Sequence, residues 1–390
     1  MDAQPLYDLS PAIRLMLMGA VIALGPLAWV WLRHRGAAPG QRRRALTLLT
    51  LFLTFDLVLF GAFTRLTDSG LGCPDWPGCY GNASPLGAQG AIAAAQAAMP
   101  TGPVTHGKAW VEMVHRYLAT GVGVLILTLA VSSLFGRRRT AARAGAAVAS
   151  WRWPWATLAW VCLQGAFGAL TVTMKLFPAV VTLHLLGGLG LLVLLCVQAV
   201  RQGQADGAPP VVLSPALRMG LWLTALLLVA QVALGGWVST NYAVLACSEF
   251  PTCQGRWWPE MDFGQGFTLW RPLGLLPDGS HISFAALTAI HFTHRLMAGA
   301  VFVALGLLAW RLWQVPGLRR PARWLAGLAL WQFASGLSNV VLGWPLVAAV
   351  AHTGGAAALV VALAWALAAS RTATAPARER AAPFHDPAVS

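Results

Sequence analysis

The stretch Gly61–Cys79 reads GAFTRLTDSGLGCPDWPGC, and a related stretch, Gly235–Cys253, reads GGWVSTNYAVLACSEFPTC. The two align without a gap, so that their cysteines coincide as Cys73 with Cys247 and Cys79 with Cys253. A duplication of this kind inside one chain predicts two structurally related halves.

Other motifs recur in the same order. EMVHR at Glu112–Arg116 returns as HFTHR at His291–Arg295. A glutamine then stands twenty residues before a histidine in each half, as Gln164 before His184 and Gln332 before His352. Each half therefore carries one cysteine pair followed by two repeated histidines.

The composition is typical of a membrane protein. Of 390 residues, 57% are hydrophobic and 10% are charged, and the mean hydropathy is +0.63, well outside the range of a soluble domain. Apolar runs of about 18 residues or more can cross a hydrocarbon core of about 30 Å. We expect nine such spans, at 15–32, 45–63, 109–135, 155–173, 180–200, 219–239, 286–310, 324–342 and 347–369.

The net charge of +14 indicates membrane orientation and no nucleic-acid partner. Arginines gather in alternate connections between spans, and the positive-inside rule places these connections in the cytoplasm. The C-terminus is then cytoplasmic. The loops that carry the cysteines lie on the outer, periplasmic face of a bacterial inner membrane, in contact with membrane lipid.

These observations predict an all-α integral membrane protein of two tandem pseudo-symmetric four-helix bundles. Eight core transmembrane helices are expected, with one extra N-terminal helix. Four spans return the chain to the same side, so the halves are parallel repeats about an axis along the membrane normal. The predicted parts are an extra helix and basic loop at 1–44, an N-terminal half at 45–200, a cytoplasmic linker at 201–217, a C-terminal half at 218–369 and a disordered cytoplasmic tail at 370–390.

The repeated histidines form one pair in each half, His115 with His184 and His294 with His352. At 1.5 Å of rise per residue, all four lie about 6–12 Å below the outer surface. A lone membrane histidine is often a helix contact, whereas four in matched places indicate function. Imidazoles from two neighbouring helices can ligate haem iron from both sides, while zinc would require more ligands. We therefore expect one haem in each half, both near one face.

The residues beside the histidines differ between the halves. Glu112 stands one turn before His115, and its counterpart is His291. A carboxylate there can exchange a proton at the macrocycle edge, or can simply favour the helix start. The difference predicts one reactive site, in the first half. Arg116 and Arg295 are expected to pair with haem propionates, the alternative being contact with the outer interface.

The cysteine pairs lie on the oxidising side, so each is expected to close a disulfide. Each disulfide either staples its loop or exchanges electrons near a haem. Glycines that follow the histidines, such as Gly187 and Gly354, allow close approach of either a flat ring or another helix. The sequence leaves these alternatives open.

Together, TRLTDSGLGCPDWPGCYG, EMVHR, TLHLLGG, HFTHR and AHTGG resemble the haem A synthase family over residues 45–369. The resemblance implies oxidation of the C8 methyl group of haem O to a formyl group, which gives haem A for an aa3-type cytochrome oxidase. It implies a resident haem B on His294 and His352, with haem O as substrate at His115 and His184. Glu112 matches the family's essential glutamate, and the first cysteine pair matches one proposed to act in turnover.

The implied partners are a haem O synthase and the cytochrome oxidase assembly machinery. The extra first span departs from the family's eight-helix pattern. Two other functions fit the residues: a dihaem b-type electron carrier, which would hold both haems permanently, and a haem chaperone or exporter, which would release its haem unchanged. A homo-oligomer is also compatible with a repeat inside one chain.

Overall fold

The computed structural model describes residues 9–141 and 151–372. The long helices in this part of the chain are α1 (Ser10–Arg33), α2 (Pro39–Leu66), α4 (His106–Ala141), α5 (Arg152–Thr173), α6 (Pro178–Ala205), α7 (Pro215–Thr240), α9 (Phe284–Trp313), α10 (Arg319–Val341) and α11 (Leu346–Ala369). The short elements are η1 (Pro85–Ala88), α3 (Gln89–Ala98), β1 (Val211–Leu213), η2 (Ala243–Ala246), α8 (Phe263–Gly266) and β2 (Ser370–Thr372).

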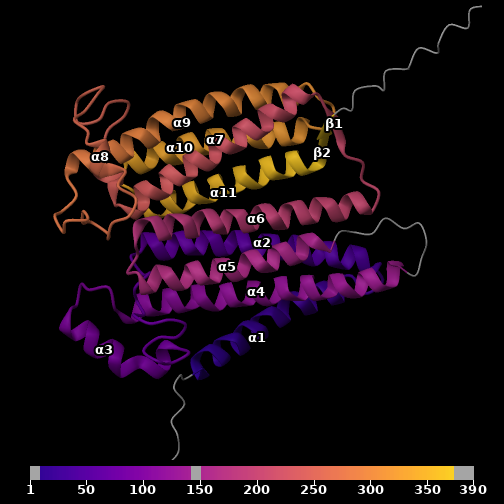
Figure 1. Cartoon of the computed structure of the whole chain (residues 1–390), viewed down its shortest axis with the longest axis horizontal. Coiled ribbons are helices and arrows are strands. Elements are labelled where there is room, and N and C mark those ends of the chain that lie inside the picture. The colour runs from indigo at the N-terminus through magenta and orange to yellow at the C-terminus, as the bar shows by residue number, and fades with distance from the viewer. Residues whose placement is uncertain (1–8, 142–150, 373–390) are drawn as a thin grey trace, which may run out of the picture.

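The prediction of an all-α membrane protein is confirmed. Eight helices in the described residues are long and apolar enough to cross a membrane, namely α1, α2, α4, α5, α6, α7, α9 and α11. The ninth expected span corresponds to α10, which lies beside them (Figure 1). It falls short in apolar character because it begins with arginines and contains Gln332, Ser335 and Asn339.

The helices form two groups of four (Figure 1). The first contains α2, α4, α5 and α6, and the second contains α7, α9, α10 and α11. At the junction α6 packs on α11, while α2 packs on α11 and α7 packs on α6. This exchange of equivalent contacts is what a pseudo-two-fold axis between parallel repeats produces.

Local sequence sets where the helices begin. Pro39, Pro178 and Pro215 each stand in the first turn of a helix, where the missing N–H costs nothing. Before α9, the hydroxyl of Ser283 accepts a hydrogen bond from the N–H of Ala286. That contact satisfies one of the free N–H groups of the first turn.

The extra helix α1 packs against α4, on the outside of the first group. A Cβ added at Gly19 would lie 2.4 Å from Cγ2 of Thr120, so only glycine permits this approach. Leu15 of α1 also packs against the cysteine loop, together with Met113 and Tyr117 of α4. The second group has no corresponding helix among the described residues.

The two ends of the molecule differ. At one end lie the long loops, with α3 in the first and α8 in the second (Figure 1). At the other end β1 and β2 form a parallel pair in which Val211 is opposite Ser370. Ser370–Thr372, the start of the predicted disordered tail, is therefore a short strand, and residues 373–390 lie outside the described residues.

Candidate functional site

The four repeated histidines lie on α4, α6, α9 and α11, at the end that carries the long loops. They stand nine, six, ten and six residues after the first residue of their helices, or about 9–15 Å along the helix axes. All four therefore lie at similar distances from the starts of their helices. His115 interacts electrostatically with His184, and His294 with His352, so the structure brings together the predicted pairs.

Each imidazole faces a glycine on another helix of the same half. A Cβ added at Gly61 of α2 would lie 3.1 Å from Nε2 of His115, and one at Gly168 of α5 would lie 3.4 Å from Cε1 of His184. Four helices thus build the site, two with histidines and two with glycines.

The second half repeats this arrangement. A Cβ added at Gly235 of α7 would lie 3.0 Å from Cε1 of His294, and one at Gly336 of α10 would lie 3.1 Å from Cε1 of His352. In the internal alignment Gly235 corresponds to Gly61 and Gly336 to Gly168. A role for these four glycines was not predicted, although they occupy matching positions in the repeat.

The glycines that follow the histidines serve mainly helix packing. A Cβ at Gly187 would lie 2.1 Å from Oε1 of Gln164, and one at Gly355 would lie 2.3 Å from Nε2 of Gln332. At these two positions the glycines therefore allow contact between helices and not contact with a flat ring. The space close to the imidazoles comes instead from the glycines on the facing helices.

Hydrogen bonds hold both histidines of the second half. The amide nitrogen of Gln231 lies 3.1 Å from Nδ1 and 3.4 Å from Nε2 of His294, and it donates to the carbonyl oxygen of His294 at 3.2 Å. The hydroxyl of Ser335 lies 2.9 Å from Nδ1 of His352 and donates to the carbonyl of Trp331 at 2.7 Å. A hydroxyl has one proton, so Ser335 accepts from Nδ1–H and leaves the Nε2 lone pair of His352 available for a metal.

The first half holds only one of its histidines in this way. The amide of Gln164 lies 3.1 Å from Nδ1 of His184. His115 has no hydrogen-bonding partner among the described residues, and its ring stacks on Phe60 at 6.3 Å between centroids. The position equivalent to Gln231 is Leu57, which offers no hydrogen bond.

Glu112 is buried, at 4% exposure, and both of its carboxylate oxygens are bound. One accepts the N–H of Cys73 at 2.7 Å, and the other accepts from Nη2 of Arg116 at 2.6 Å. The carboxylate therefore joins the helix of His115 to the cysteine loop. In the second half, its buried counterpart His291 leaves Nδ1 without a hydrogen-bonding partner.

The two arginines after the histidines bind the cysteine loops. Arg116 donates from Nη1 to the carbonyl oxygens of Asp75, Pro77 and Gly78. Arg295 likewise binds the carbonyl oxygens of Cys247, Glu249 and Thr252. Loop anchoring was not among the expected roles. Contact with a haem propionate stays a prediction, for which the buried and unpartnered Nε of Arg295 is available.

Both predicted disulfides are present, Cys73–Cys79 and Cys247–Cys253, and all four cysteines are fully buried. Each loop turns back through two residues in the left-handed region, Tyr80–Gly81 in the first and Gln254–Gly255 in the second. The two loops thus share one local conformation, and each is bound by the arginine that follows a histidine.

The donor set fits haem better than a bare metal ion. Within residues 9–141 and 151–372, no group of three or more His, Cys, Asp or Glu side chains could hold a metal ion. A macrocycle supplies the iron's other four ligands, so two imidazoles from facing helices suffice. A Cβ at any of the four facing glycines would press on an imidazole, so these glycines make room for the ligand rings themselves.

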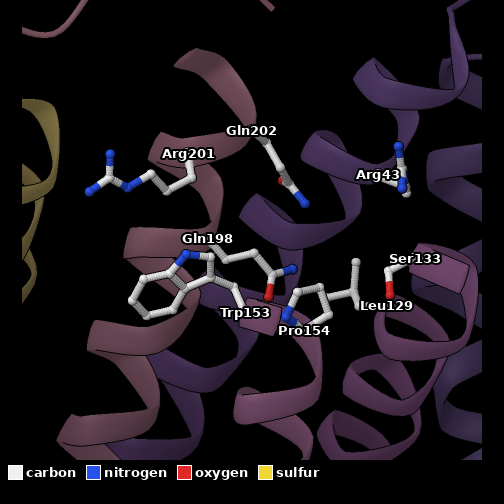
Figure 2. Close-up of a pocket in the computed structure, with 8 residues that line it drawn as sticks. All are labelled: Arg43, Leu129, Ser133, Trp153, Pro154, Gln198, Arg201 and Gln202. Carbon is white, nitrogen blue, oxygen red and sulfur yellow. The ribbon is translucent and has the colours of Figure 1, made fainter. Parts of the chain in front are cut away.

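A small cavity lies at the opposite end of the first half, away from the histidines (Figure 2). Gln198 is fourteen residues after His184 on α6, which is about 21 Å along the helix. The side-chain amide oxygens of Gln198 and Gln202 are buried there without partners, and the volume of about 30 Å³ suits a buried water. It is therefore no part of the histidine sites.

Residues 44–364 match a family model described as "COX15-CtaA: Cytochrome oxidase assembly protein". A protein of Shewanella oneidensis named heme A synthase is 38% identical over 321 residues, which cover 81% of this chain and 92% of the relative. Proteins of the same name are 28% identical in Rhizorhabdus wittichii, over 85% of this chain and 96% of the relative, and 29% identical in Symbiobacterium thermophilum, over 80% and 90%.

Proposed function

Because the chain belongs to the COX15-CtaA family of cytochrome oxidase assembly proteins, we propose that it is a haem A synthase. Its reaction is the oxidation of the C8 methyl group of haem O to a formyl group, which yields haem A for an aa3-type cytochrome oxidase. The main support from the structure is the duplicated histidine site, whose two copies have the same ligands and glycines but different surroundings.

The residues around the two histidine pairs support different roles for the two pairs. A hydrogen bond to the second nitrogen of a ligating imidazole fixes its orientation and strengthens the metal bond. His352 donates such a bond to Ser335, and the amide of Gln231 lies against the ring of His294 and donates to its carbonyl oxygen. Both rings of this half are thus held in place, which suits a resident haem B. His115 lacks such a hydrogen bond, which suits a haem that must enter and leave, so His115 and His184 are proposed to hold haem O.

When bound, the haems supply the redox chemistry. The protein holds the macrocycles, and the cysteine loops cover the sites. Glu112 is proposed to hold or move the proton at the reacting edge, since it is a buried carboxylate one helical turn before His115. Its bonds to Cys73 and Arg116 place it between the first disulfide and the first site.

The arginine-rich connections are proposed to face the cytoplasm of a bacterium, by the positive-inside rule. The long loops and both disulfides are then periplasmic, and the histidines lie near that face of the inner membrane. A haem O synthase is the proposed supplier of substrate, and the oxidase assembly machinery the proposed recipient of product.

Haem analysis tests the proposal. The full chain is purified after co-expression with a haem O synthase, and its extracted haems are identified by chromatography and mass spectrometry. We expect haem B together with haem O and haem A. Two haem B per chain without haem A in the membranes would indicate an electron carrier, and haem O that stays unchanged would indicate a chaperone.

A further inference from the structure

A polar cluster joins the two halves where α2 and α7 end. Nη2 of Arg65 donates to the carbonyl oxygen of Ser239 at 2.6 Å, and Nη1 pairs with Oδ1 of Asp68 at 3.2 Å. The hydroxyl of Tyr242 donates to the same carboxylate oxygen at 2.5 Å. The guanidinium carbon of Arg65 also lies 4.2 Å from the centroid of the Tyr242 ring. Residues 174 apart in sequence are therefore bound tightly across the junction.

The cluster is formed by residues that the internal repeat relates to one another. In the internal alignment Arg65 corresponds to Ser239, and Asp68 corresponds to Tyr242. Asp68 and Tyr242 both have positive φ, of 51° and 55°, a conformation that costs energy in a residue with a side chain. Here the contacts with Arg65 hold both residues in it.

The same residues connect the two histidine sites. Arg65 is one helical turn after Gly61, which touches His115, and Ser239 is one turn after Gly235, which touches His294. One turn is about 6 Å along the axis. One polar connection between the sites therefore runs through a turn of α2, the Arg65–Ser239 hydrogen bond and a turn of α7.

The charges in the cluster are unequally screened. The side chain of Arg65 is 14% exposed, whereas that of Asp68 is 55% exposed. Water screens the carboxylate more strongly than the buried guanidinium. The sites therefore experience mainly the positive charge of Arg65.

We propose that Arg65 is a positioning residue that ties the two sites together and, through its charge, favours the reduced form of the resident haem. This inference rests on the proposed function. Oxidised haem iron carries one more positive charge than the reduced form, so a nearby cation destabilises it and raises the midpoint potential. Loss of the cation lowers the potential, and loss of its partner carboxylate raises it.

The test is a spectroelectrochemical titration of the full chain, purified with one haem per chain. Arg65→Gln should lower the midpoint potential, and Arg65→Lys should restore most of the difference. Ser239→Ala is the matched control, since Arg65 binds the backbone oxygen of Ser239, and its potential should equal that of the unmodified protein.

Asp68→Asn gives a result of opposite sign and does not depend on the stability of the Arg65 variants. It leaves the guanidinium uncompensated, so the midpoint potential should rise. An unchanged potential in Arg65→Gln, or a fall in Asp68→Asn, would overturn the inference alone, because the unmodified protein still shows its resident haem. An unmodified protein without any six-coordinate haem would overturn the proposed function, and the inference with it.

Discussion

The two halves share four helices, two histidines, two facing glycines, a disulfide and an arginine that anchors the disulfide loop. They differ at a few matched positions around the histidines: Glu112 against His291, Leu57 against Gln231 and Phe167 against Ser335. Gln231 and Ser335 lie beside His294 and His352, whereas Leu57 and Phe167 offer no hydrogen bond and Glu112 adds an acid to the first half. One scaffold is thereby proposed to serve two purposes, through the residues that surround its histidines.

The residues that pack against each disulfide differ between the halves as well. In the first half Leu15 of α1 joins Met113 and Tyr117 around the disulfide. In the second half Phe292, which corresponds to Met113, packs with the disulfide and is met by the largely exposed Trp258. The first disulfide therefore packs against a helix that lies outside the region matched to the family.

The largest effect is expected from the axial ligands. His294→Ala should abolish binding of the resident haem, because one imidazole cannot supply both axial positions. His115→Ala should leave that haem in place and remove only the haem of the first half. Optical and electron paramagnetic resonance spectra of the purified variants measure both. Equal haem loss in the two variants would contradict the assignment of separate roles.

The next effect concerns the acid that distinguishes the halves. Glu112→Gln should keep both haems but lower haem A formation by about 100-fold or more, the range for loss of a general acid or base. The amide can still accept the N–H of Cys73, so the loop should keep its place. Haem A is measured in extracted membranes.

His291→Gln is the matched control for this acid, because it changes the equivalent position of the second half. Its haem A output should stay near that of the unmodified protein. Undiminished haem A formation by Glu112→Gln would contradict the proton-handling role of Glu112. Loss of haem A formation in both variants would indicate that these positions are required for the structure.

The sequence predicts most of this architecture, since length and apolar character locate the spans and the repeat pairs His115 with His184. It does not reveal what faces each histidine, because Gly61 and Gly168 lie on other helices and come close only through packing. The binding of Arg116 to loop carbonyls is hidden for the same reason: a guanidinium suits several acceptors, and the nearest one depends on the fold of a loop about forty residues away.

A smaller effect is expected from exchanging the residues at one matched position. Gln231→Leu gives the second half the residue of the first and removes the amide beside His294, so resident haem should bind about 10–100-fold more weakly. Leu57→Gln makes the reverse exchange and should slow the release of haem from the first half. Competition with apomyoglobin measures both rates. Equal rates of haem release in the exchanged and unmodified proteins would show that haem retention does not depend on this contact.

The smallest effect is expected at Ser335. Ser335→Ala removes one hydrogen bond to Nδ1 of His352, which is worth about 1 kcal/mol, or roughly fivefold in haem affinity. Gln332 still donates to the carbonyl oxygen of His352 at 2.7 Å, so α11 should keep its position and the spectrum should stay six-coordinate. Ser338→Ala is the control on the same helix, since its hydroxyl bonds only to the carbonyl oxygen of Ser335. If Ser335→Ala retains haem as well as Ser338→Ala does, the ordering of His352 comes from the helix and the facing Gly336 alone, and the contrast between the halves narrows to Gln231 and Glu112.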